Sequence, residues 1–196
     1  MIKAVIFDLD GTLVDSLEGY IYAFQEALKR SNLPIMSRDE FGKLYGQIDT
    51  EIFRKFLNKP KIDEEIEAVA KLKQKLFLEN GVKYITANPG ALELITALFQ
   101  RKIPMAIASS SRISAIKSAV KKFNLEDKIK IIVSAEDITN SKPHPEIFLK
   151  AAEKLNTLPE NCIVFEDSLH GVLAAKAAHM ACAAVATGQS PAVPAP

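Results

Sequence analysis

A short apolar run that ends at two aspartates constrains this chain more than any other feature of its sequence. Residues 3–7, Lys-Ala-Val-Ile-Phe, are β-prone and stop abruptly before Asp8 and Asp10. Such a run is typical of a buried strand in a parallel sheet. Two carboxylates at the mouth of a buried strand are costly unless a cation or a proton compensates them. The pattern therefore predicts a charged site at the end of this strand.

The next two residues indicate what compensates the charge. Gly11 permits a tight turn whose backbone N–H groups can point at an anion, and Thr12 adds a hydroxyl. Carboxylates beside such a turn favour a site where Mg²⁺ and a phosphate meet. The alternative is that Asp10-Gly11 is only a hairpin turn. We disfavour it because an amphipathic helix, and no second strand, is predicted to follow.

Composition excludes several classes of function. The chain has 196 residues, 48% of them hydrophobic, and a net charge of +1, so nothing indicates binding to nucleic acid or to a membrane surface. No apolar run approaches the roughly 20 residues of a membrane span. Apolar residues begin at Ile2, so we expect no signal or transit peptide. Cys162 and Cys182 lie in apolar runs and are predicted to be buried, reduced thiols of a cytoplasmic protein.

Residues 16–83 contain only helical patterns. Apolar residues recur at helical spacing over 17–31, 50–57 and 63–79, and a further short helix is predicted over 37–45. Ser37 and Glu40 have the spacing of a capping box at the start of that short helix. We interpret 16–83 as a small helical bundle inserted into an α/β chain.

From residue 88 onwards the pattern alternates between strand and helix. Asn88 is the predicted N-cap of a helix with Pro89 at its first position. Strands are predicted over 104–108, 129–134, 162–165 and 181–186, with helices over 113–123, 145–155 and 169–178. This alternation predicts an α/β fold, a Rossmann-like parallel sheet with helices on both faces. The core thus comprises 1–15 and 84–188, and 189–196 form a Pro/Ala-rich tail.

Chemically active residues follow the ends of four predicted strands. Ligands of open parallel sheets bind outside the carboxyl ends of the strands. Besides the two aspartates, these ends carry a serine cluster with Arg112, a lysine before a proline, and a pair of acids: Ser109, Ser110, Ser111, Lys142, Glu166 and Asp167. We expect them to converge on one crevice.

Each of these groups also has a purely structural interpretation. A serine could cap the next helix, and we expect one of them to do so, while Ser109 is the best candidate for direct contact with a phosphate. Lys142 could be a solvated lysine, but its place before Pro143 favours a fixed cation. Glu166 and Asp167 could merely be acids at the N-terminus of the next helix, where the helix dipole favours negative charge. At the end of an apolar strand, we favour metal ligation by both, Glu166 directly or through water.

Residues 7–16, Phe-Asp-Leu-Asp-Gly-Thr-Leu-Val-Asp-Ser, closely resemble the first motif of the haloacid dehalogenase superfamily. Ser109 resembles the second motif, Lys142 the third, and Glu166-Asp167 the fourth. The helical insert is similar to the cap of the subfamily that contains phosphoglycolate phosphatase and β-phosphoglucomutase. The resemblance covers roughly residues 1–188.

The resemblance implies a Mg²⁺-dependent phosphatase that hydrolyses a small phosphomonoester, such as a sugar phosphate, through an aspartyl-phosphate. Asp8 would be the nucleophile and Asp10 the general acid and base, and the helical cap (residues 16–83) would close over the site. The implied protein is a cytoplasmic monomer without nucleic-acid or membrane partners. The expected metal ligands are Asp8, Asp10, Glu166 and Asp167, and the expected phosphate or substrate contacts are Leu9, Gly11, Gly46, Ser109, Ser110, Arg112 and Lys142.

Two other functions remain open. The hexose-phosphate mutases of this subfamily carry a histidine and an arginine where this chain has Tyr20 and Asp49. Asp49 would repel the second phosphate that a mutase must hold, so hydrolysis is favoured, although Arg54 or Arg112 could supply a replacement cation. The other alternative is a non-catalytic relative that only binds a phosphate ligand. Such a protein would be expected to lose Asp8, Asp10 or Lys142, and all three are present.

Overall fold

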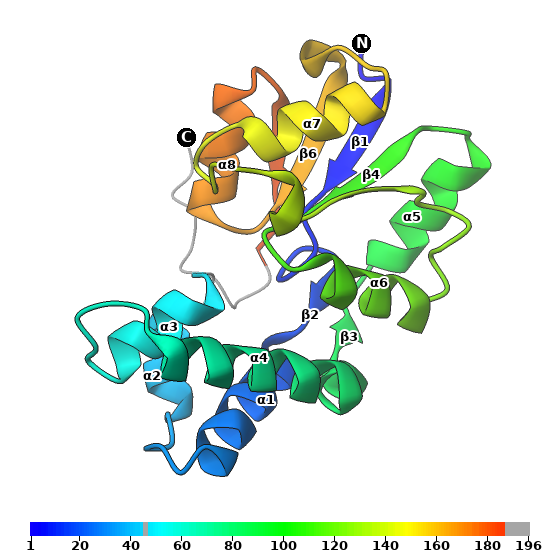
Figure 1. Ribbon diagram of the computed structural model, residues 1–196. Helices are drawn as coiled ribbons and strands as arrows, with labels where there is room; N and C mark the ends of the chain where they lie inside the picture. The colour runs from blue at the N-terminus through cyan, green and yellow to red at the C-terminus, as the bar shows by residue number, and fades with distance from the viewer. Residues whose placement is uncertain (45–46, 187–196) are drawn as a thin grey trace. The chain divides into compact units, whose positions relative to one another are not determined.

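The computed structural model describes residues 1–44 and 47–186 (Figure 1). Gly46, predicted to contact substrate, and the tail 189–196 lie outside the described residues. The chain divides into two compact units, one formed by Met1–Asp15 with Thr86–Pro196 and the other by Ser16–Ile85. We call them the α/β unit and the helical unit.

The α/β unit is built on a five-stranded parallel sheet in the order β5-β4-β1-β6-β7. Its central strand β1 pairs with β4 on one side and with β6 on the other, so that Phe7 stands beside both Ile107 and Phe165. The apolar runs found in the sequence are these strands, with ends shifted by one to two residues. Their bounds are β1 Ala4–Phe7, β4 Met105–Ala108, β5 Ile131–Val133, β6 Cys162–Glu166 and β7 Ala181–Ala184.

Helices cover the sheet on both faces (Figure 1). Alternate side chains of β1 and β4 pack with α7 and α8 in one fully buried core that includes Ile6, Ala106, Phe148 and Ala174. The other helices of this unit, α5 and α6, lie on the opposite face, as right-handed crossovers require. The helices are α5 Ala91–Gln100, α6 Ile113–Lys122, α7 Glu146–Lys154 and α8 Leu169–Ala177, and short 3-10 turns span Ala135–Asp137 and Pro159–Asn161. The predicted fold class is confirmed.

Two local predictions in this unit are wrong. A two-residue strand, β2 Val14–Asp15, does follow the aspartates and pairs antiparallel with β3 Thr86–Ala87. Helix α5 has Gly90 at its N-cap, with a φ of 80°, where we expected Asn88. The side chain of Asn88 is instead committed to the loop after β1, as described below. The strand pair was not predicted because two residues are too few to show the alternation of a strand.

The helical unit consists of α1 Leu17–Arg30, α2 Arg38–Leu44, α3 Asp49–Phe56, α4 Glu64–Glu79 and a 3-10 turn at Gly81–Tyr84. The capping box of α2 is confirmed, since the Ser37 N–H donates to Glu40 Oε2 at 2.8 Å and the Glu40 N–H to Ser37 Oγ at 3.3 Å. Inside this unit the buried Lys73 donates to both carboxylate oxygens of Asp49, at 2.8 and 2.9 Å. The charge of Asp49 is therefore matched within its own unit.

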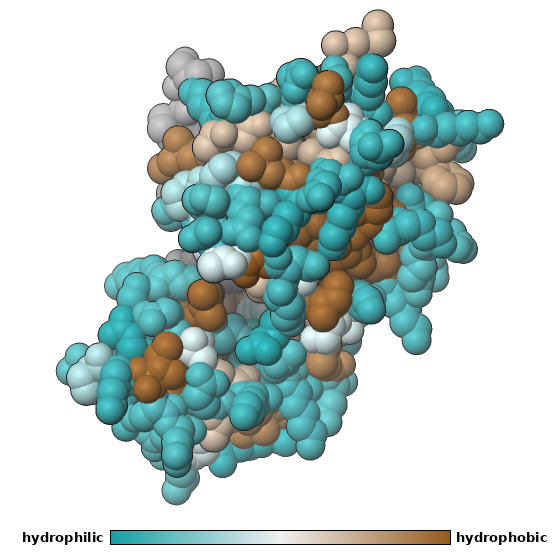
Figure 2. Space-filling model, turned by 45° about the horizontal axis from the view of Figure 1, so that its top comes forward, coloured by the Kyte–Doolittle hydropathy of each residue, from teal (hydrophilic) through white to brown (hydrophobic). Residues whose placement is uncertain are grey.

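The face shown in Figure 2 is mostly hydrophilic, with hydrophobic residues gathered in separate patches. Among the described helices, none combines the length and the apolar character needed to cross a membrane. Both cysteines are free thiols, Cys162 buried and Cys182 partly exposed. The prediction that both are buried is wrong for Cys182, because β7 is an edge strand of the sheet.

Candidate active site

The loop after β1 holds Asp8 and Asp10 at the carboxyl end of the central strand. The Asp8 N–H still donates to the Phe165 carbonyl at 3.0 Å, so this residue continues the sheet pairing and its side chain is buried. The chain then turns sharply, because the carbonyl of the buried Leu9 accepts from the N–H groups of Leu13 and Val14 at 2.9 and 3.0 Å. The predicted tight turn is therefore present.

Gly11 is required in this turn for two reasons. Its φ is +88°, which L side chains rarely adopt, and a Cβ there would lie 2.2 Å from Asp167 Oδ2. Its N–H donates to the Val14 carbonyl at 2.8 Å. The turn itself therefore uses this donor, and the predicted contact of the turn with an anion stays a prediction.

Asn88 anchors the same loop from the segment after β3. Its Nδ2 donates to the Gly11 carbonyl at 3.0 Å and to the Thr12 carbonyl at 2.9 Å. A single amide thus fixes two successive peptide groups between the aspartates and β2. This role of Asn88 was not predicted, because Asn-Pro-Gly also matches a helix start.

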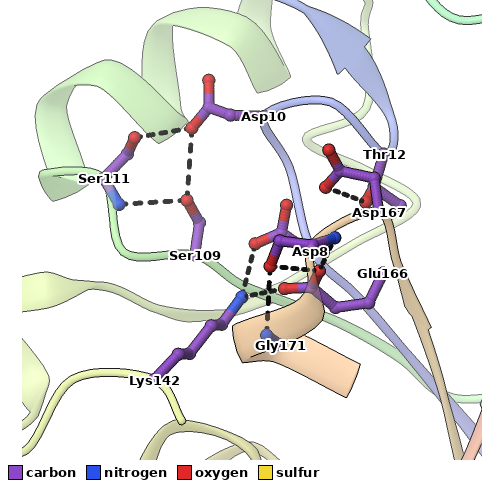
Figure 3. Close-up of polar contacts among 10 residues, drawn as sticks. Asp8, Asp10, Thr12, Ser109, Ser111, Lys142, Glu166, Asp167 and Gly171 are labelled. Atoms are coloured by element: carbon purple, nitrogen blue, oxygen red, sulfur yellow. Dashed lines mark hydrogen bonds and ion pairs between the residues drawn. The ribbon is translucent and has the colours of Figure 1, made fainter. Parts of the chain in front are cut away.

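Lys142 bridges two carboxylates from different strands (Figure 3). Its Nζ lies 2.6 Å from Asp8 Oδ1 and 2.6 Å from Glu166 Oε1, and its side chain is only 8% exposed. The ammonium also lies 4.9 Å from the ring centroid of Phe148 in α7. The predicted fixed cation is present, since Lys142 is held on three sides and not solvated.

Burial dominates the electrostatics of this cluster. Desolvation raises the pKa of Asp8 well above its usual value, against the attraction of Lys142 and with the help of Glu166 and Asp167. Burial alone would lower the pKa of Lys142, but attraction to Asp8 and Glu166 raises it above its usual value. Asp8 and Glu166 therefore share one ammonium, and Asp167 adds a third buried carboxyl group close to Asp8, so acids outnumber the cation.

Glu166 is fixed by the start of α8. Its Oε2 accepts from the Ser168 N–H at 2.7 Å and from the Ser168 hydroxyl at 2.9 Å, and the same hydroxyl accepts from the Gly171 N–H at 3.0 Å. A Cβ on Gly171 would lie 1.8 Å from Glu166 Cδ, so no larger residue fits there without moving the acid. Asp167 accepts from the Thr12 hydroxyl at 3.2 Å.

The loop after β4 faces Asp10 with two serines. Asp10 Oδ2 lies 2.6 Å from Ser111 Oγ and 3.4 Å from Ser109 Oγ, and the Ser111 N–H donates to Ser109 Oγ at 3.0 Å. Ser109 is buried, as expected for the first residue after the strand. The contact of Ser111 with Asp10 was not predicted, because three consecutive serines give no sign of which one faces the acid.

Other predictions for this loop are only partly met. We expected a serine to cap α6, but Arg112 is the N-cap residue and the Ile113 N–H donates to Glu136 Oε2 at 2.9 Å. Ser110 and Arg112 are exposed. Their predicted contact with substrate stays a prediction.

The carboxylates around Asp8 are of the chemical type that binds a divalent metal. Within 1–44 and 47–186, no three His, Cys, Asp or Glu side chains form a ready-made metal site. However, Asp8, Glu166 and Asp167 are buried carboxylates with one ammonium among them, and hard oxygen ligands with excess negative charge suit Mg²⁺. The residues present are therefore compatible with the metal that the sequence implies.

Comparison with known proteins is consistent with this geometry. Residues 5–185 match the family described as haloacid dehalogenase-like hydrolase. The phosphorylated carbohydrates phosphatase of Thermotoga maritima is 31% identical over 180 residues, covering 90% of this chain and 81% of that protein. Hexitol phosphatase B of Escherichia coli is 30% identical over 184 residues, covering 91% and 81%. The structure of β-phosphoglucomutase from Clostridium difficile has a TM-score of 0.81 at 30% identity, covering 94% and 84%.

Proposed function

The chain belongs to the haloacid dehalogenase-like hydrolases, and on that premise we propose that it is a Mg²⁺-dependent phosphatase acting on a small phosphomonoester through an aspartyl-phosphate. The family match and the named phosphatases identify it as a phosphoric monoester hydrolase. The resemblance stated from the sequence is confirmed at that level. The metal, the intermediate and the substrate are the proposal.

The bridging position of Lys142 carries the proposal. An ammonium 2.6 Å from both Asp8 and Glu166 brings a cation next to the carboxylate that would attack phosphorus. A fixed ammonium in a buried site stabilises charge that develops on a transferring phosphoryl group, and it needs no reorganisation at that moment. A purely structural ion pair would not require a further buried acid, Asp167, close to Asp8.

The proposed reaction uses the residues in named roles. Asp8 Oδ attacks phosphorus in line while the Ser109 hydroxyl and Lys142 donate to the phosphoryl oxygens. Asp10 gives a proton to the leaving alcohol as the ester P–O bond breaks. Asp10 then takes a proton from a water whose oxygen attacks the aspartyl-phosphate, which frees phosphate and restores Asp8.

Mg²⁺, when bound, would neutralise phosphoryl oxygens and the acids around them. We propose Asp8, Asp10 and Asp167 as its protein ligands, with Glu166 acting directly or through water. Glu166 is held by Ser168 and Lys142, so it could orient the lysine even without touching the metal. Removing Mg²⁺ with a chelator is expected to abolish turnover without unfolding the protein.

A sugar phosphomutase is the second candidate, because the match to β-phosphoglucomutase is as close in sequence as those to the phosphatases. We favour hydrolysis because an acid, Asp49, stands at the position nearest to the mutase arginine, so this position supplies no cation for a second phosphate. The neighbouring cation, Lys73, is paired with Asp49. Lys73 is therefore engaged inside its own unit and offers no unmatched charge to a second phosphate.

Phosphate release from a panel of phosphomonoesters, with Mg²⁺ and with chelator, tests this function. The panel holds hexitol and sugar phosphates, phosphoglycolate, nucleotides, and glucose 1-phosphate with its 1,6-bisphosphate. We expect Mg²⁺-dependent release concentrated on one or two compounds. Isomerisation of glucose 1-phosphate without release would establish the mutase instead. No turnover by folded protein with Mg²⁺ would favour a non-catalytic phosphate-binding protein.

We also propose that the protein is a cytoplasmic monomer. The two free cysteines suit a reducing compartment. Light scattering at working concentration tests the monomer, and a mass of twice the chain would contradict it.

A further inference from the structure

The hydroxyl of Ser111 has no role in the proposed reaction as described so far, yet it makes a very close contact with Asp10. Ser111 Oγ lies 2.6 Å from Asp10 Oδ2, against 3.4 Å for Ser109 Oγ (Figure 3). The shorter distance is that of a charge-assisted hydrogen bond between a hydroxyl and a carboxylate, and the longer one is too long for a strong bond. Ser111, more than Ser109, therefore holds this oxygen of Asp10.

The two serines are coupled through the backbone. The Ser111 N–H donates to Ser109 Oγ at 3.0 Å, so this hydroxyl accepts from one side and has a single hydrogen to donate. If Ser109 gives that hydrogen to a phosphoryl oxygen, it can no longer give it to Asp10. The Ser111 hydroxyl then becomes the serine contact that keeps Asp10 in place while substrate is bound.

We propose that Ser111 is a positioning residue for the general acid and base of this enzyme. By donating to Oδ2, it turns the other carboxyl oxygen of Asp10, which points away from both serines in Figure 3, toward the leaving oxygen and later the attacking water. Asp10 gives its proton to the departing alkoxide and regains one from water, and Ser111 keeps its own hydrogen throughout. The inference rests on the proposed function, in which Asp10 performs these transfers.

Esters with different leaving groups separate this role from a structural one. An alkyl phosphate expels a strongly basic alkoxide that needs a proton, whereas p-nitrophenyl phosphate expels a stable phenolate that does not. The value of kcat/KM reports the steps up to the departure of the leaving group. A variant in which Asp10 donates its proton less well should therefore lose much more kcat/KM on the alkyl ester than on the aryl ester.

The experiment measures kcat/KM of wild type and Ser111→Ala for p-nitrophenyl phosphate and for the alkyl phosphomonoester that the wild-type protein hydrolyses best. We expect Ser111→Ala to lose about tenfold on the alkyl ester, the upper end of the effect of one hydrogen bond, and less than about twofold on the aryl ester. Ser111→Thr keeps the hydroxyl and should restore most of the alkyl activity. Asp10→Asn should show the same selectivity with a larger loss.

Two further variants serve as controls. Ser118→Ala in α6 removes a serine hydroxyl that donates to the Ser114 carbonyl at 2.9 Å, away from Asp10, and should leave both esters unchanged. Ser109→Ala removes a proposed phosphoryl contact and should slow both esters alike. The unfolding midpoint of each variant shows whether it is folded.

The outcomes distinguish failure of the inference from failure of the proposed function. Equal losses on both esters in Ser111→Ala, or no rescue by threonine, would refute the positioning role and leave the phosphatase intact. A wild-type protein that hydrolyses neither ester would refute the proposed function and the inference with it. Asp10→Asn without selectivity would refute Asp10 as the acid, and Ser111 would then have no acid to position.

Discussion

Replacing Lys142 by methionine tests the electrostatic account of the site most severely. The change keeps the length and the apolar stem of the side chain and removes only the ammonium. Asp8 and Glu166, each 2.6 Å from Nζ, would then be buried without their shared cation. Breaking a buried ion pair by removing one partner costs about 3–5 kcal/mol. We expect a loss of about 3 kcal/mol in the free energy of unfolding at pH 8, since relaxation and water recover part of the penalty.

The loss should depend on pH in a stated direction. Burial raises the pKa of Asp8 even with Lys142 present, and removing the ammonium removes the main opposing influence. A buried acid whose folded-state pKa is raised destabilises the protein increasingly as the pH rises from its unfolded value of about 4. The difference between wild type and Lys142→Met should therefore be largest at pH 8 and should shrink toward pH 5, where the acid takes up a proton.

Urea unfolding in chelator measures this difference without a contribution from divalent cations. Lys75→Met is the matched control, because the Lys75 side chain is 70% exposed and its Nζ lies 3.8 Å from Glu79 Oε1. Removing an exposed pair of this kind should change the free energy of unfolding by less than about 0.5 kcal/mol. A loss below about 1 kcal/mol in Lys142→Met at pH 8, or a loss that grows toward pH 5, would refute the reasoning.

Three further predictions concern two supports of the site, Gly171 and Asn88, and the cap of the 3-10 turn after β5. Gly171→Ala must displace Glu166, so activity should fall at least tenfold while the protein stays folded by circular dichroism; unchanged activity would contradict the crowding. Asn88→Ala leaves two carbonyls of the loop after β1 without their amide donor and should cost about 1–2 kcal/mol in urea unfolding; no loss would contradict the anchor. Hydrogen bonds from the Ser134 backbone and hydroxyl lower the pKa of Asp137 to about 2. Asp137→Asn should therefore cost about 1 kcal/mol in the free energy of unfolding at pH 7, after a discount for solvent screening. The difference from wild type should vanish between about pH 4 and pH 2, and a constant difference would contradict this.

The sequence predicts those parts of the structure that leave a pattern along the chain. The five parallel strands are short apolar runs bounded by polar residues, and their order along the chain, with helices between them, fixes a parallel sheet. The acids and serines follow these runs directly, and the lysine follows β5 after a short connection. Because parallel strands end at one edge, their convergence near Asp8 follows from topology without side-chain detail.

The remaining features depend on contacts between distant segments. Asn88 reaches the loop after β1 across more than 70 residues of chain, and nothing near it in the sequence indicates that partner. In the sequence Gly171 looks like an ordinary helical glycine, and only the structure shows that Glu166 occupies the space that a Cβ would need. Ser111 differs from its neighbours Ser109 and Ser110 only in the direction of its side chain. Sequence alone therefore predicted which acids, serines and lysine follow the strand ends, but not the residues that hold them in place.

Trapping the phosphorylated enzyme tests the central claim most directly. Wild-type protein is mixed with its best substrate and Mg²⁺, quenched in acid within one turnover, digested, and analysed by mass spectrometry. The account predicts one added phosphoryl group on the peptide that contains Asp8, lost on treatment with hydroxylamine and absent from folded Asp8→Asn, which should also lack turnover. Full turnover by Asp8→Asn, or a phosphoryl group on any other residue, would contradict it.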